Sequence, residues 1–99
     1  MSYPIGPTPY APAGYIHKRR YQTDNSLALV CMNERNEPLY TASVKLDTPP
    51  QINCVWIKTW SENVGVLEAL IDAHIVFPTG RVQPVGGKGA KAIEVELLV

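Results

Sequence analysis

Residues 54–81, CVWIKTWSENVGVLEALIDAHIVFPTGR, decide the fold that this sequence predicts. The stretch begins with an apolar run that is typical of a strand, and Ser61 then offers an N-cap for a helix. Apolar residues follow at helical spacing and predict a buried stripe: Val64, Leu67, Leu70, Ile71 and Ile75. Gly65 inside the first turn costs roughly 1 kcal/mol relative to alanine, which we interpret as close packing of another segment against it. Pro78 and Gly80 are expected to end the helix.

Apolar runs on both sides of this stretch predict the remaining strands. In residues 26–46, SLALVCM is apolar on both faces, as in a central strand, and LYTASVKL alternates. The alternation predicts a buried face made of Tyr40, Ala42, Val44 and Leu46. Residues 93–97 again alternate between apolar and charged residues, and we expect Ile93, Val95 and Leu97 to face the core. We therefore predict an α+β fold in the order β-β-β-α-β(-β), with about four or five strands in one small antiparallel sheet and the helix packed on one face.

Residues 1–22 differ in composition from the rest of the chain. They hold four of the nine prolines, four of the five tyrosines and no acidic residue. Proline lacks the backbone donor that a central strand needs, and Pro-x-x-Pro spacing favours polyproline II. We therefore predict an extended arm over residues 1–22 and a single α+β domain over residues 23–99. The arm is either a disordered terminus or a segment that docks on a partner through its tyrosines and its basic run.

Composition and charge limit the classes of function. Nine basic and nine acidic residues cancel in a chain of 99 residues, which argues against strong whole-molecule attraction to nucleic acid or to an anionic membrane. Cys31 and Cys54 are predicted to be reduced and buried; a disulfide between strands and a redox role are the alternatives. Together with His17 and His74 they lack zinc spacing, so we expect no metal site. Without a signal peptide or a membrane-spanning run, a cytoplasmic location is expected.

The sequence contains no catalytic constellation, so we expect neither enzymatic activity nor a cofactor. Glu68 and Asp72 lie four residues apart, which is more typical of a solvated helix face than of a paired-carboxylate site. His74 near the helix end is more suited to stabilising the helix dipole than to catalysis. The glycine-rich loop departs from a Walker A motif because Gly87-Lys88 is followed by another glycine. It predicts a mobile hairpin loop.

The strand at residues 54–60 offers the best candidate for a binding surface. If Val55 and the alternate residues after it face the helix, the outer face carries Trp56, Lys58 and Trp60. Two indoles around a lysine form a platform for stacking bases or for an apolar partner. The alternatives are the opposite register, or a lid formed over the rings by the N-terminal arm.

The run Trp60-Ser61-Glu62-Asn63, together with Leu67, Leu70 and Thr79-Gly80-Arg81, resembles a family of short proteins of bacterial plasmids, phages and other mobile elements. The chain departs from that family's pattern in two places. Val64 replaces a glutamate that would complete a capping box with Ser61, and His74 replaces a glycine. The resemblance implies no activity. It implies the setting of a mobile-element accessory protein, some of which antagonise host defence such as CRISPR systems.

Three hypotheses of function follow. The first is a non-enzymatic inhibitor of a bacterial defence complex, of the anti-CRISPR type, which occupies a host protein through the face at residues 56–60 or through Glu68 and Asp72. That acidic face would mimic phosphates only with support from Glu62, Glu94 or Glu96. The second is a single-stranded nucleic-acid binder that uses the indoles for stacking and these residues for phosphates: Lys18, Arg19, Arg20, Lys58, Arg81, Lys88 and Lys91. The third is a homodimer joined through an edge strand.

Overall fold

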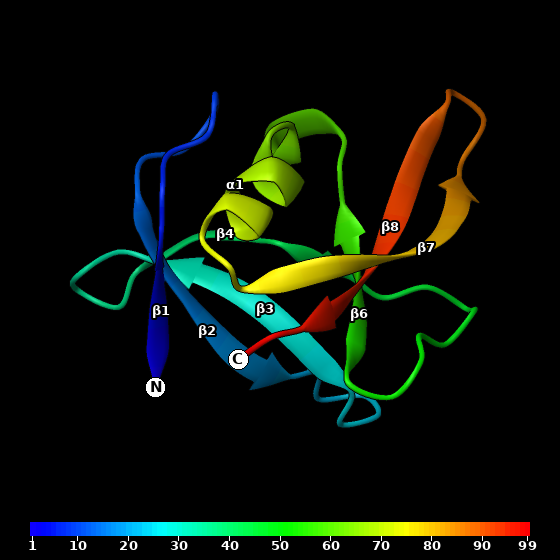
Figure 1. The fold of residues 1–99 in the computed structure, drawn as a ribbon, viewed down its shortest axis with the longest axis horizontal. Coiled ribbons are helices and arrows are strands. Elements are labelled where there is room, and N and C mark those ends of the chain that lie inside the picture. Colours follow the sequence, from blue (N-terminus) through cyan, green and yellow to red (C-terminus); the bar gives the residue numbers. More distant parts are fainter.

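Eight strands and one α-helix make up the computed structural model, which describes residues 1–99. The strands form two antiparallel sheets of four, in the orders β1-β2-β3-β4 and β5-β6-β8-β7 (Figure 1). Their bounds are β1 (Ser2–Ile5), β2 (Gly14–Arg20), β3 (Leu27–Met32), β4 (Pro38–Thr41), β5 (Ser43–Val44), β6 (Cys54–Lys58), β7 (Val76–Val85) and β8 (Ala90–Leu97). The predicted α+β class is confirmed, but the strands divide between two sheets where one was predicted.

A corner at Ala42 carries the chain from the first sheet into the second. The Ala42 amide donates to the Leu29 carbonyl in the first sheet at 2.9 Å, and the Ala42 carbonyl accepts from the Lys58 amide in the second at 3.0 Å. Beyond this corner the odd-numbered residues, and no longer the even-numbered ones, point inward. Ser43 is buried, whereas Val44 pairs with Trp56, which lies on the side of β6 that faces away from the core. The predicted alternation is therefore right as far as Ala42 and wrong after it.

The helix is shorter than predicted. Ser61 begins a 3₁₀ turn (Ser61–Asn63), and α1 (Val66–Asp72) begins only after Gly65, whose φ of 89° reverses the backbone. A Cβ atom at Gly65 would lie 2.7 Å from Cδ of Pro9, so the close packing predicted for this glycine is confirmed. The interruption moves the buried stripe to Val66 and Leu70 and leaves Val64 exposed.

Pro78 and Gly80 belong to β7 and do not end the helix. The helix ends earlier, at a left-handed residue, His74, whose φ is 59°. The His74 amide donates to the Ile71 carbonyl at 3.0 Å and the Ile75 amide donates to the Leu70 carbonyl at 3.1 Å. These two bonds are the pair that defines a Schellman motif.

Residues 1–22 form part of the first sheet, so the predicted extended arm is wrong. β1 pairs with β2, and β2 pairs with the central strand β3. Ile5 and Ile16 are 3% and 0% exposed and belong to the main core. The prolines are compatible with this because Pro4 lies on the edge strand and the other three lie in the loop that follows it, where no ladder donor is required.

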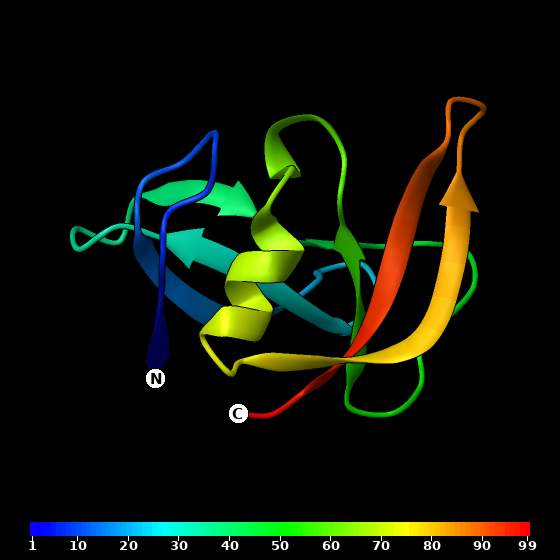
Figure 2. The same ribbon diagram turned by 45° about the horizontal axis from the view of Figure 1, so that its top comes forward.

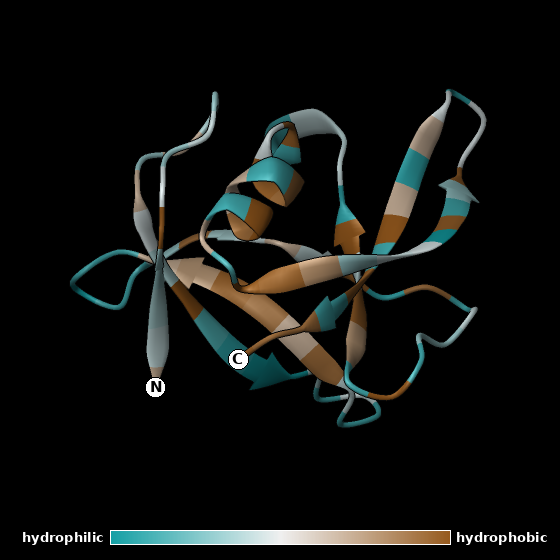
Figure 3. Ribbon diagram, in the orientation of Figure 1, coloured by the Kyte–Doolittle hydropathy of each residue, from teal (hydrophilic) through white to brown (hydrophobic).

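The core lies where the two sheets and α1 meet. Figure 2 shows α1 lying between the first sheet on the left and the second sheet on the right. Fully buried side chains come from every part of this arrangement: Ile16, Leu29, Ile57, Leu70 and Val95. Hydrophobic colour follows β3 and much of β6, whereas the outer half of the β7–β8 hairpin alternates between hydrophilic and hydrophobic residues (Figure 3). The hairpin thus extends beyond the part of the sheet that the helix covers.

Candidate binding surfaces

Trp56 is buried, so the predicted platform of two exposed indoles is wrong. The register was predicted correctly, since Val55 and Ile57 face the core and Trp56 points to the other side of the sheet. Trp56 is nevertheless only 2% exposed. Its Nε1 donates to the Thr48 carbonyl at 2.8 Å, and the Arg81 guanidinium lies 5.2 Å from the ring centre. The loop at Thr48 and the Arg81 side chain therefore contact the indole.

Glu94 organises the polar groups around Trp56. Its buried carboxylate accepts hydrogen bonds from the Gln51 backbone amide at 3.0 Å, from Thr79 Oγ1 at 2.5 Å and from the Arg81 guanidinium at 2.7 Å. Burial alone would raise the pKa of Glu94, but the bonds from Thr79 and Gln51 and the charge of Arg81 outweigh it and lower that pKa. Arg81 is therefore committed to an internal ion pair and is not a free phosphate ligand.

Lys58 is the last residue of β6, and Trp60 follows the strand. Lys58 Nζ lies 5.7 Å from the centre of the Trp60 ring and 2.6 Å from Oε1 of Glu62. The side-chain hydrogen bond from Lys58 lowers the pKa of the Glu62 carboxyl. The predicted Trp56, Lys58 and Trp60 surface is thus reduced to one half-exposed indole beside a paired lysine.

A groove of about 760 Å³ lies between the outer half of the β7–β8 hairpin and the segment that leads into α1. We call it the hairpin groove. Its apolar lining comes from Trp60, Val64 and Leu67 on one wall and from Ile93 on the other. Its charged lining comes from Lys88 and Lys91 on the hairpin and from Glu68 on the helix. Sequence reasoning predicted four of these residues for separate surfaces; Val64 was missed because it was assigned to a buried stripe.

The acidic helix face lacks the support that phosphate mimicry requires. Glu68 and Asp72 are both exposed. Glu94, however, is buried on the side of the second sheet that faces away from the core, and Glu96 lies on that same side. Glu62 is paired with Lys58. Of the two exposed acids, Glu68 lines the hairpin groove together with Trp60, Lys88 and Lys91, and Asp72 does not.

The basic residues predicted to bind phosphates do not form one surface. Lys18 Nζ donates to the Val99 carbonyl at 3.0 Å, and Arg20 donates to the Asn25 carbonyl at 3.2 Å. Arg19 lies with them on β2, whereas Lys88 and Lys91 lie on the β7–β8 hairpin at the other side of the molecule (Figure 1). Only the hairpin pair shares a groove with an indole.

Three of the four edge strands contain proline. The outermost strands are β1 and β4 in the first sheet and β5 and β7 in the second. Pro4 lies within β1, Pro38 within β4, and Pro78 and Pro84 within β7, whereas β5 is only two residues long. A register shift between Pro78 and Val82 further interrupts β7. Prolines and bulges are features by which natural edge strands avoid pairing with another chain, so the geometry gives the edge-strand dimer no support.

The cysteines are free and buried, as predicted, and form no disulfide. Burial raises the pKa of both thiols, which disfavours the reactive thiolate. No three histidine, cysteine or acidic side chains come close enough together to hold a metal ion. Neither helical segment has the length and apolar character needed to cross a bilayer. Comparison with protein-family models, curated proteins and solved structures found no match.

Proposed function

We propose that this protein is a non-enzymatic binding module that acts by occupying the surface of a partner protein through the hairpin groove. The observation that carries this proposal is the exposed apolar lining of the groove. Val64 is 44% exposed, and Trp60 and Leu67 remain half-buried beside it. An aromatic ring next to aliphatic groups, framed by charges of both signs, has the composition of an interface centre with a polar rim.

The finer proposal is that the partner belongs to a bacterial defence complex and that binding inhibits it, as an anti-CRISPR protein does. Its support is the sequence resemblance to accessory proteins of mobile elements, carried by residues 60–63 and 79–81. The geometry bears on the mode of action and not on the identity of the partner. A partner of this kind places the action of the protein in the bacterial cytoplasm.

Two matched variants test the groove. Val64→Asp puts a charge on the apolar wall, and Ile52→Asp makes the same change at an aliphatic residue that is 96% exposed and outside the groove. Tagged wild type and both variants are used to capture proteins from a bacterial lysate, and the captured protein is then purified and titrated. We expect Val64→Asp to weaken binding at least about tenfold and Ile52→Asp to leave it unchanged. Equal binding by Val64→Asp and wild type would contradict the proposal.

A second candidate, single-stranded nucleic-acid binding, is favoured by one observation. The groove places Lys88 and Lys91 beside Trp60, which combines phosphate ligands with a stacking ring. The test is fluorescence anisotropy of a labelled oligonucleotide at two salt concentrations. Binding should weaken with salt and should be lost in Lys88→Gln/Lys91→Gln but kept in Lys18→Gln. Absent or salt-insensitive binding would exclude this function and leave the protein partner as the remaining candidate.

A further inference from the structure

A second hollow lies on the other side of the molecule, next to Tyr15 of β2. It has a volume of about 320 Å³ and is lined by Pro4, Ile5, residues 13–15 and the turn at 33–35. A smaller hollow of about 250 Å³ adjoins it and shares three of its residues: Tyr15, Asn33 and Glu34. The half-buried Tyr15 side chain thus forms a wall of both hollows, and Glu34 borders both.

The turn that carries Glu34 is held by the Asn33 side chain and by two backbone hydrogen bonds, from the Asn33 amide to the Glu37 carbonyl and from the Asn36 amide to the Asn33 carbonyl. Asn33 Oδ1 accepts hydrogen bonds from the Arg35 amide at 2.9 Å and from the Glu37 amide at 3.0 Å, and Asn33 Nδ2 donates to Glu37 Oε1 at 2.9 Å. Asn36 supplies the left-handed residue of the turn, with a φ of 60°. These bonds fix the backbone on either side of Glu34, which positions its carboxylate beside β2.

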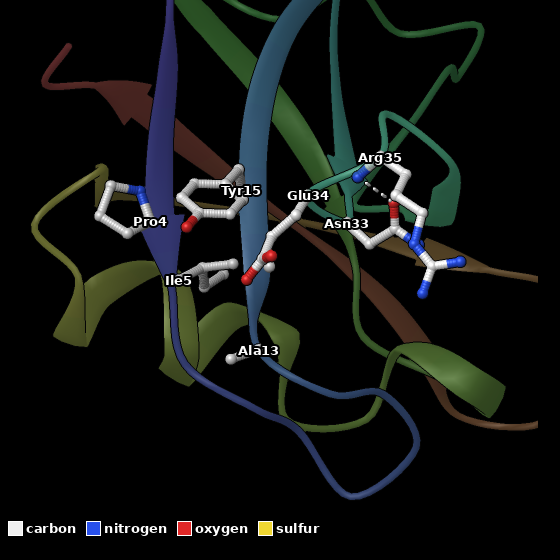
Figure 4. Close-up of a pocket in the computed structure, with 8 residues that line it drawn as sticks. Pro4, Ile5, Ala13, Tyr15, Asn33, Glu34 and Arg35 are labelled. Carbon is white, nitrogen blue, oxygen red and sulfur yellow. Dashed lines mark hydrogen bonds between the residues drawn. The ribbon is translucent and has the colours of Figure 1, made fainter.

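Glu34 is a carboxylate without a cation. The three ion pairs of the structure involve other acids: Asp24, Glu62 and Glu94. Figure 4 shows the Glu34 side chain turned toward the hollow beside Tyr15, while the Arg35 guanidinium points away from it. The acid therefore lies next to an aromatic ring and forms no ion pair, although Arg35 lines the same hollow and His17 lines the adjoining one.

We propose that this hollow binds the guanidinium group of an arginine side chain from a partner protein. A guanidinium is planar, so it can stack on the Tyr15 ring while its paired N–H groups donate to the Glu34 carboxylate. An ammonium group lacks the planar fork and would gain less from the same two residues. The hollow is lined by β1, β2 and the turn after β3, which lie at the opposite side of the molecule from the outer half of the β7–β8 hairpin (Figure 1), so it adds a second contact that is independent of the function proposed above.

The test is a titration of isotope-labelled protein with N-acetylarginine amide, followed by two-dimensional NMR. We expect saturable shifts at residues 14–15 and 33–35, with a dissociation constant of the order of millimolar for one side chain. N-acetylcitrulline amide, which has the same shape without the charge, should produce no saturable shift. Nα-acetyllysine amide, which keeps its charged ε-ammonium group, should bind at least about threefold more weakly than the arginine compound.

Two variants separate this site from general acidity. Glu34 is exposed, so the Glu34→Gln variant should fold, which its amide NMR spectrum will show. The substitution should weaken binding of the arginine compound at least about fivefold. Glu68→Gln removes an exposed carboxylate from the hairpin groove and should leave arginine binding unchanged. The proposal is overturned if no saturable shift appears below about 50 mM. Equal binding of citrulline or lysine, or undiminished binding by Glu34→Gln, overturns it as well.

Discussion

Arg81 binds Glu94 through a 2.7 Å hydrogen bond from its guanidinium to Oε2, although the Glu94 side chain is completely buried. The same guanidinium lies over Trp56 and covers its ring. Thr79 completes the arrangement, because β7 bulges between Pro78 and Val82 and so directs both Thr79 and Arg81 at one carboxylate. Thr79 and Arg81 therefore tie the bulged part of β7 to Glu94 of the neighbouring strand β8.

Replacing Glu94 should destabilise the fold. Glu94→Gln removes the negative charge that compensates Arg81. It also replaces one of the two acceptor oxygens by an NH2 group, which cannot accept a hydrogen bond. We therefore expect a loss of about 1–3 kcal/mol in the free energy of unfolding. Urea denaturation followed by tryptophan fluorescence measures it. Glu96→Gln is the matched control on the same strand, and because Glu96 is exposed it should change stability by less than about 0.5 kcal/mol. Equal stability of the two variants would refute the role given to Glu94.

The same carboxylate should make the protein sensitive to acid. The pKa of Glu94 is lower in the folded protein than in the unfolded chain, so the unfolded chain binds the proton more tightly. The stabilisation is complete above the unfolded value of about 4.3 and is lost as the pH falls through the folded value. Wild type should therefore lose more stability than Glu94→Gln between about pH 5 and pH 3.

Part of the acid sensitivity should remain in that variant. The Ser26 side chain and amide and the Lys45 ammonium lower the pKa of Asp24 to about 2, which gives a stability change of the same sign. Adding Asp24→Asn to Glu94→Gln should flatten the profile further. Urea midpoints measured across this pH range test both steps, and parallel profiles for wild type and the Glu94 variant would contradict the assignment.

Local signals made the fold class predictable from the sequence, along with the facing of β6 and the tight packing at Gly65. Each of these depends on alternation or on a backbone preference within a few residues. The two-sheet arrangement was not predictable in this way, because it depends on the corner at Ala42, where the chain changes sheets without a proline or glycine to mark it. Residues 1–22 were misread because their prolines lie on an edge strand and in a loop, which composition does not distinguish from an arm.

The binding surfaces were less predictable than the fold. Alternation correctly places Trp56 on the outer side of its strand, but its burial depends on Arg81, which is distant in the sequence, and on how the loop at Thr48 folds back over the strand. The hairpin groove likewise brings Trp60, which follows β6, close to Lys91 of β8, and the pairing of these two strands could not be predicted from the sequence. What sequence analysis could supply was the residue types, and what it lacked was the tertiary contacts that determine which of them are free.

His74 is expected to be a site where stability can be gained. It occupies the left-handed position of the Schellman motif, with a φ of 59°, which glycine adopts without strain. His74→Gly should therefore raise the free energy of unfolding by up to about 1 kcal/mol at neutral pH. His74→Ala removes the imidazole but keeps the Cβ atom, so it should give no gain. Urea denaturation of the three proteins decides, and a gain in the alanine variant would show that the imidazole, and not the backbone, is the source of strain.

Gly65 is expected to be a site where almost any side chain is harmful. Its φ of 89° disfavours other residues, and a Cβ atom there would lie 2.7 Å from Cδ of Pro9. Gly65→Ala should lower the free energy of unfolding by about 2–3 kcal/mol, whereas Gly87→Ala, at ordinary φ with nothing within 4 Å, should change it little. Pro9→Ala removes the clashing atom, so Gly65→Ala should cost about 1 kcal/mol less in that background. Strictly additive effects of the two substitutions would mean that the N-terminal loop does not press on the start of α1 in solution.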